Sequence, residues 1–96
     1  MDYTGKQKAK LRKLANAKPV MFQVGIAGLS DVVIKNILDY LKKHEVGRIS
    51  ILKGCKEDIS DIIAKLGDNN IYVTARIGRV LLLYKANPEL KDRIVL

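Results

Sequence analysis

The chain has 96 residues, of which 48% are hydrophobic and 29% charged, an ordinary composition for one folded domain. No apolar run approaches the length that a membrane-spanning helix needs, so we expect no membrane segment. The helix predicted near the start of the chain has only Leu11 and Leu14 as sizeable apolar residues, too few for stable insertion, so we expect no membrane partner. Eighteen Lys and Arg against ten Asp and Glu give a net charge of +8, which favours polyanionic partners.

The start of the chain is the most basic part of the sequence. Residues 1–18 hold six Lys and Arg against Asp2 alone, a net charge of +5. A solubilising arm would explain such a run as well as a binding surface does. The opening MDYTGKQKAK lacks the features of a secretory signal, and the lone Cys55 cannot form an internal disulfide. Both observations favour a cytoplasmic location.

The first predicted element is a helix from about Gly5 to Ala17. Thr4 followed three residues later by Gln7 fits a capping box, and Pro19 ends the helix. On a helical wheel three cations line up within about 60° of one another and form a basic ridge. These residues are Lys6, Lys10 and Lys13.

A strand is predicted at Val20–Val24, followed by the turn Gly25–Gly28 and a second helix from Ser30 to His44. Ser30 is a good N-cap, and His44 falls where a helix dipole favours positive charge. Apolar residues recur on one face of this helix and charged residues on the other. We therefore expect the helix to lie against a sheet.

The second half of the chain predicts a strand at Gly47–Leu52, a helix at about Glu57–Leu66, and strands at Ile71–Arg76 and Val80–Tyr84. Gly67 is placed to end the helix in a left-handed conformation. The last strand is nearly all apolar, which predicts a central position in the sheet.

The element order predicts an α+β fold, a two-layer single domain ordered α-β-α-β-α-β-β. Strand-helix-strand units favour parallel pairing, and the final hairpin adds an antiparallel pair, so the four-stranded sheet is expected to be mixed and packed with helices. We expect one domain over residues 1–96, with a core of about 4–85 and a tail of 86–96.

Motifs for catalysis are missing from the sequence. It has no nucleophile elbow, Walker A loop, paired cysteines or His-rich cluster, and GIAG lacks the rest of a dinucleotide fingerprint. Glu57 and Asp58 are adjacent in the predicted third helix, which suits dipole stabilisation better than acid–base chemistry. We therefore expect no enzyme, no catalytic residue, no cofactor and no metal site.

The turn GIAG, Gly25-Ile26-Ala27-Gly28, is the main candidate for ligand contact. In a strand-GxxG-helix arrangement the first glycine allows a sharp turn, the second allows close approach, and the amides at the following helix start point outward. A nucleic-acid phosphate fits that geometry, as in KH domains. A glycine pair in this place is also common as a plain connection.

Two more groups of cations follow predicted strands. Lys53 and Lys56 flank Gly54-Cys55 after the second strand, and Arg76 and Arg79 bracket the tight connection of the last hairpin. Each group alone could be a solvated face, but together with the basic ridge they favour a surface that binds several phosphates. Four Tyr and one Phe are few for base stacking, so recognition should rely on backbone and shape.

Four ordered segments resemble the CRM domain, the family that includes stand-alone bacterial YhbY proteins and repeated modules of plant organelle splicing factors. They are TGKQKAKLRKLA, KPVMFQVGIAGLSD, GCKED and IGRVLLLYK, and they span about residues 4–85. The resemblance implies an RNA-binding domain with a fold similar to the carboxy-terminal domain of translation initiation factor three. It further implies an association with precursor large ribosomal subunits.

By position, the resemblance makes Gly25, Ile26, Ala27 and Gly28 the GxxG loop. It makes the basic residues of the first helix, with Lys53, Lys56, Arg76 and Arg79, the supporting surface. Similar proteins usually carry a basic residue inside the loop, whereas Ile26 and Ala27 are apolar. Backbone amides could still bind phosphate, or Ile26 could pack on a sugar, a base or a ribosomal protein.

Two hypotheses follow. The first is a non-catalytic, monomeric RNA-binding protein that binds ribosomal RNA or precursor large subunits and assists ribosome assembly. The alternative is a protein-interaction adaptor, in which the apolar loop and the tail around Ile94-Val95-Leu96 dock on a ribosomal protein and the charge serves only solubility. Binding that falls steeply with salt distinguishes the first from the second.

Overall fold

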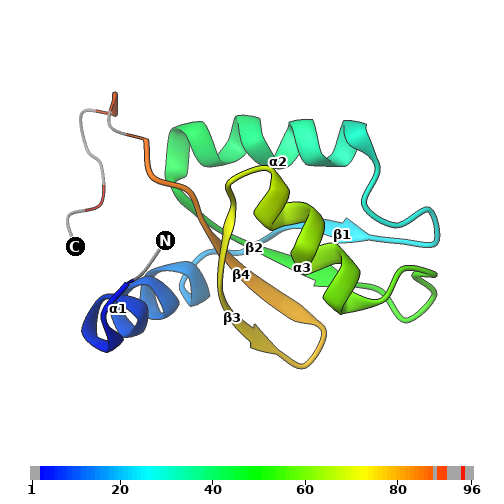
Figure 1. Ribbon diagram of the computed structural model, residues 1–96, viewed down its shortest axis with the longest axis horizontal. Helices are drawn as coiled ribbons and strands as arrows, with labels where there is room; N and C mark the ends of the chain where they lie inside the picture. Colours follow the sequence, from blue (N-terminus) through cyan, green and yellow to red (C-terminus); the bar gives the residue numbers. More distant parts are fainter. Residues whose placement is uncertain (1–2, 88, 91–93, 95–96) are drawn as a thin grey trace.

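The computed structural model describes residues 3–87, 89–90 and 94 (Figure 1). The elements occur in the predicted order α-β-α-β-α-β-β, which confirms the α+β class. They are α1 (Gly5–Asn16), β1 (Val20–Val24), α2 (Asp31–His44), β2 (Val46–Ile51), α3 (Ile59–Asp68), β3 (Tyr72–Ile77) and β4 (Val80–Tyr84).

The four strands form one mixed sheet in the order β1-β2-β4-β3. β1 is parallel to β2, whereas β4 is antiparallel to both β2 and β3. Strands β1, β2 and β3 therefore run in the same direction, and their carboxyl ends meet at one edge of the sheet. The predicted central position of the last strand is confirmed, because β4 lies between two neighbours and residues Leu81 to Tyr84 are buried.

One face of the sheet packs against α2 and α3. Leu81 and Leu83 of β4 point into this larger core, where they meet residues such as Ile37 and Leu41 of α2 and Ile62 of α3. The burial of this apolar surface supplies most of the driving force for folding. Sheet and helix pair form the two expected layers.

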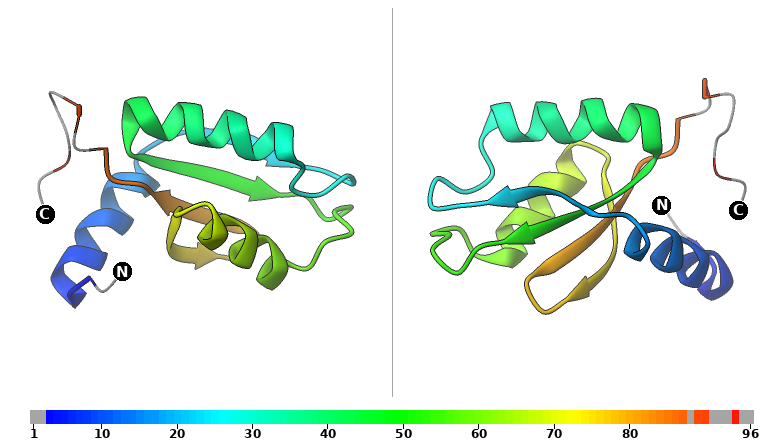
Figure 2. Two further views of the ribbon diagram at one scale, coloured as in Figure 1. Left: turned by 45° about the horizontal axis from the view of Figure 1, so that its top comes forward. Right: turned by 180° about the vertical axis from the view of Figure 1, so that it is seen from behind.

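The first helix packs on the opposite face of the sheet. Leu11 and Ala15 of α1 are buried against Leu82 and Tyr84, which alternate along β4 with the residues of the larger core. Figure 2 shows α1 across one end of this face, leaving the rest of the face uncovered by helix. The sheet thus carries a partial third layer at that end.

Local capping agrees with the sequence at two helix starts. Thr4 and Gln7 form both hydrogen bonds of the capping box, 3.0 and 3.2 Å long, and the Ser30 hydroxyl accepts from the Val33 amide at 3.3 Å. The prediction for Gly67 is wrong: α3 continues to Asp68, and the left-handed residue is Asn70, with φ of 59°. Asn tolerates this conformation better than most residues.

The segment after β4 returns to the end of α2. Glu45 is buried, and its carboxylate accepts hydrogen bonds from the amides of Asn87 at 2.8 Å and Ile94 at 2.6 Å. Ile94 packs against the core beneath α1. The other two residues of the predicted docking tail, Val95 and Leu96, lie outside the described residues. Among the residues described, no helix is both long and apolar enough to cross a membrane.

Candidate nucleic-acid interface

Three connecting segments meet where the parallel strands end. Residues 25–28 follow β1, residues 52–58 follow β2, and residues 78–79 follow β3; we call this region the carboxyl edge. Backbone hydrogen bonds join neighbouring segments: the Leu52 amide donates to Val24 O at 2.9 Å, and the Ile51 amide donates to Arg79 O at 2.7 Å. Ligands of open sheets that contain parallel strands gather at such edges.

The GxxG loop is a tight turn with an inner and an outer half. The Gly28 amide donates to Gly25 O at 3.0 Å, and Gly28 has φ of 72°, a left-handed conformation that favours glycine. Gly28 is buried, whereas Ala27 is exposed and Ile26 is 67% exposed. Within the described part of the chain, the amides of Ile26 and Ala27 donate to no acceptor. These two donors are free to bind a ligand.

A carboxylate occupies the inner side of the loop. Oε1 of Glu57 accepts the Leu29 amide at 2.5 Å, and Oε2 pairs with Lys65 Nζ at 2.7 Å. The hydrogen bond from Lys65, followed by the one from the Leu29 amide, lowers the pKa of the Glu57 carboxyl below its ordinary value. The predicted start of the third helix is wrong: α3 begins at Ile59, so Glu57 lies before the helix and Asp58 is its N-cap.

The turn after β2 projects beside the GxxG loop. The Cys55 amide donates to Leu52 O at 3.0 Å, so Lys53 and Gly54 form an exposed tip. A Cβ on Gly54 would lie 3.4 Å from Cγ1 of Ile26, which places the two turns in contact. Lys56 is also exposed. The structure therefore brings both predicted lysines next to the GxxG loop.

The two arginines of the β3–β4 hairpin lie on the other side of this turn. Arg79 donates from Nε to Ile51 O and from Nη2 to Leu52 O, both at 2.8 Å, so it anchors the hairpin to β2. The remaining guanidinium N–H groups are available to other partners. Arg76 donates from Nε to Gly78 O at 3.1 Å. Both arginines line an open cavity of 370 Å³ together with Lys53, Glu57 and residues 58–60.

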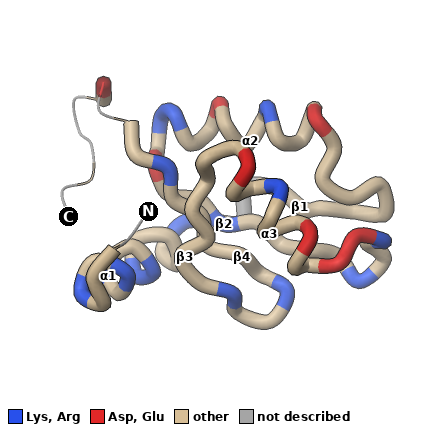
Figure 3. The backbone as a smooth tube through the Cα atoms, in the orientation of Figure 1, with Lys and Arg blue, Asp and Glu red and all other residues tan. Residues whose placement is uncertain are grey.

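The basic ridge predicted on α1 lies elsewhere. Lys6, Lys10 and Lys13 are exposed as expected, but α1 lies at the opposite end of the long axis from the GxxG loop, in a molecule that measures 36 × 25 × 23 Å (Figure 1). The ridge is therefore separate from the carboxyl edge. Figure 3 shows Lys and Arg on α1, on the hairpin and on the turn after β2, all toward one side of the view, whereas charges alternate in sign along α2.

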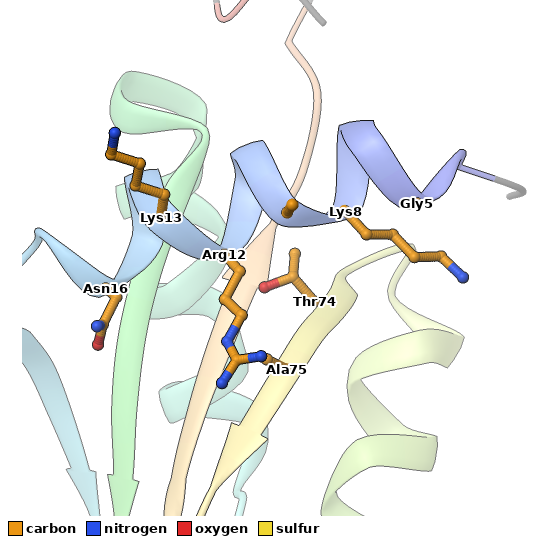
Figure 4. A pocket seen from close by; sticks show the side chains of 8 residues that line it. Gly5, Lys8, Arg12, Lys13, Asn16, Thr74 and Ala75 are labelled. Carbon is orange, nitrogen blue, oxygen red and sulfur yellow. The ribbon is translucent and has the colours of Figure 1, made fainter.

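A groove of 560 Å³ lies between α1 and the edge strand β3. In Figure 4, Arg12 reaches from α1 toward Ala75, with Lys8 at one end of the groove and Asn16 at the other. Lys13 borders the same groove, and its side chain points away from β3. The row of cations along this edge strand offers positive charge to an extended polyanion.

Sequence reasoning did not single out Lys8 and Arg12 among the basic residues of the first helix, and it gave Glu57 no part in this surface. Lys8 and Arg12 are four residues apart and share a helix face, but only the packing of Leu11 against the sheet shows that this face borders β3. Nothing in the sequence links Glu57 to the GxxG loop, because the contact depends on how two turns meet in space. Among the described residues, no group of three or more His, Cys, Asp and Glu side chains could hold a metal ion.

The fold and this clustering of loops and cations define a small α+β domain with a basic edge. The family model for the CRS1/YhbY (CRM) domain matches residues 4–85 of the chain. The chain therefore belongs to the CRM domain family, which confirms the resemblance drawn from the four sequence segments.

Two relatives extend this assignment. The chain is 37% identical over 90 residues to "Probable RNA-binding protein YqeI" from Bacillus subtilis (strain 168), a match that covers 93% of this chain and 94% of the relative. The solution structure of the hypothetical protein SAV1595 from Staphylococcus aureus, described as a candidate RNA-binding protein, superposes with a TM-score of 0.78. That match has 28% sequence identity and covers 99% of this chain and 100% of the other.

Proposed function

We propose that the protein is a non-catalytic RNA-binding protein that binds ribosomal RNA or precursor large ribosomal subunits and assists ribosome assembly. Membership of the CRM family and the names of both relatives support RNA as the ligand. The net charge of +8 suits a polyanion.

The observation that carries the proposal is the meeting of three loops at the carboxyl edge. The free amides of Ile26 and Ala27 lie beside the turn that carries Lys53, and Arg76 and Arg79 border the same turn. Backbone amides and cationic side chains are the groups that bind phosphates and set the register of a nucleic acid. The side chains of the loop itself are apolar, so the loop contacts phosphate through its backbone.

A ribosomal target is the finer part of the proposal. The cations extend from the carboxyl edge to α1, which lies at the other end of the molecule. A surface of this reach fits a folded RNA with phosphates on more than one strand better than a short single strand. Ribosomal RNA within an immature subunit is a ligand of that kind, and cytoplasmic location is part of the same proposal.

The test compares two exposed alanines. Ala27→Glu places a carboxylate beside the free loop amides, whereas Ala64→Glu places the same charge on the outer surface of α3. Binding to a fragment of large-subunit RNA should weaken at least about tenfold for Ala27→Glu, because a repelled phosphate and a lost charge-assisted hydrogen bond act together. Equal binding by both variants would exclude the loop as a contact site.

A second candidate function is favoured by one observation. Ile26 is 67% exposed, and the neighbouring Leu52 is 40% exposed, so the carboxyl edge also carries an apolar tip that could dock on a ribosomal protein. Ile94, the described residue of the predicted docking tail, packs against the core and is therefore no part of this tip. Co-sedimentation with ribosomal particles that survives both RNase and high salt would favour this adaptor over RNA binding.

A further inference from the structure

The second glycine of the GxxG loop is required by the protein itself. A Cβ on Gly28 would collide with Oε1 of Glu57 and would lie 2.8 Å from its Cγ and 2.9 Å from its Cδ. Gly28 also has φ of 72°, which strains any L-residue with a side chain. The close approach that this glycine permits is therefore made by Glu57, on the inner side of the loop.

Glu57 links the GxxG loop to α3. Its carboxylate accepts the amide of Leu29, the residue directly after the loop, and pairs with Lys65 of α3. Lys65 Nζ in turn lies 3.5 Å from the carbonyl oxygen of Leu29, so Glu57 and Lys65 together bind the backbone amide and the backbone carbonyl of Leu29. The exposed fraction of the side chain is 23% for Glu57 and 47% for Lys65, so water reaches the contact mainly from the side of the lysine.

We propose that Glu57 is a positioning residue for RNA binding: its carboxylate fixes the inner half of the GxxG loop, so that the amides of Ile26 and Ala27 face the RNA. The inference rests on the proposed function and names the group that prepares its site. Glu57 does not contact the RNA. A loop held in its bound shape loses less conformational entropy when the ligand arrives.

The direction in which RNA affinity changes when the Glu57 carboxylate is removed separates a positioning role from simple electrostatics. Removing a carboxylate near a phosphate site should strengthen RNA binding if only charge matters. Removing the positioning contact should weaken it. Asp58 is the matched control, because it is adjacent and exposed and makes no side-chain hydrogen bond at the start of α3.

The experiment measures binding of a large-subunit RNA fragment to the full chain. We expect Glu57→Ala to weaken binding about tenfold, whereas Asp58→Ala, which removes a carboxylate from the same cavity without a contact to the loop, should strengthen it. Glu57→Gln keeps an oxygen that can accept the Leu29 amide, so it should restore part of the lost affinity. Glu57→Ala that binds as tightly as the wild type, or more tightly, would overturn the proposal.

Hydrogen exchange of the Leu29 amide provides an independent readout that needs no RNA. The wild type should protect this amide, whereas Glu57→Ala should lose the protection with little change at core amides such as that of Leu82. If Glu57→Ala fails to fold, Lys65→Gln replaces it, with Lys35→Gln on α2 as the control. Only Lys65→Gln should accelerate exchange of the Leu29 amide. Equal protection in the wild type and the variants would refute the role of Glu57, whereas a wild type that does not bind RNA would refute the proposed function instead.

Discussion

The groove between α1 and β3 predicts a measurable change in the salt dependence of RNA binding. Lys8→Gln combined with Arg12→Gln removes two cations that line the groove, and glutamine keeps the helix propensity high. If each cation neutralises one phosphate, the slope of log K against log salt concentration should become shallower by about 1.4 to 1.8, the values expected for a single strand and for a duplex. The affinity itself should fall, most strongly at low salt.

The control for this change is a second pair on the far helix. Lys35→Gln combined with Lys43→Gln lowers the net charge from +8 to +6, as the groove pair does, but acts on exposed positions of α2. Fluorescence anisotropy of a labelled large-subunit RNA fragment, titrated over a salt series, gives both slopes. If the two pairs change the slope equally, the groove has no special role and only the total charge matters.

Three further predictions concern stability. Gly28→Ala should lower the free energy of unfolding in urea by at least about 1–2 kcal/mol, because the left-handed φ alone costs this much and the Cβ must also displace Glu57. Gly67→Ala, inside α3 and without a neighbour near its Cβ, should raise it by about 0.5–1 kcal/mol. Since the folded state lowers the pKa of Glu57, its contact contributes full stability above pH 4.5, the ordinary pKa of the carboxyl, and loses it as the pH falls through the lowered pKa. The protection factor of the Leu29 amide, relative to its intrinsic exchange rate at each pH, should fall there in the wild type and stay constant in Glu57→Gln. Glu45→Ala should cost about 2–3 kcal/mol by leaving two amides unpaired, and limited proteolysis should then cut the chain after β4.

The helices and strands could be predicted from the sequence because the capping residues and the periodicity of apolar residues agreed. Thr4 and Ser30 marked helix starts, and the apolar run of β4 indicated a central strand. The helix end at Gly67 was misplaced, because the turn of Asn69-Asn70 can take the left-handed residue and so leaves the glycine inside the helix. Glycine tolerates the left-handed conformation at little cost, but the neighbouring residues determine whether the chain adopts it at that position.

The candidate site was harder to predict because it depends on strand order. Insertion of β4 between β2 and β3 keeps β3 parallel to β2, which brings the hairpin arginines to the edge that carries the GxxG loop. The basic helix that precedes the loop in sequence does not lie at that edge, because α1 packs through Leu11 on the face opposite α2 and α3 and at the other end of the sheet.

The same geometry explains why the loop can lack a basic side chain. The inner half of the loop is held by Glu57 and Lys65, so its outer amides keep their direction without help from the apolar Ile26 and Ala27. In the proposed binding mode, positive charge comes instead from Lys53 on the adjoining turn, where a Cβ on Gly54 would lie 3.4 Å from Cγ1 of Ile26. The orientation of the loop amides and the positive charge are thus supplied by different segments. The substitution Ile26→Lys should therefore strengthen RNA binding without altering the protection of the Leu29 amide from hydrogen exchange. Stronger binding accompanied by loss of that protection would mean that the two contributions are coupled.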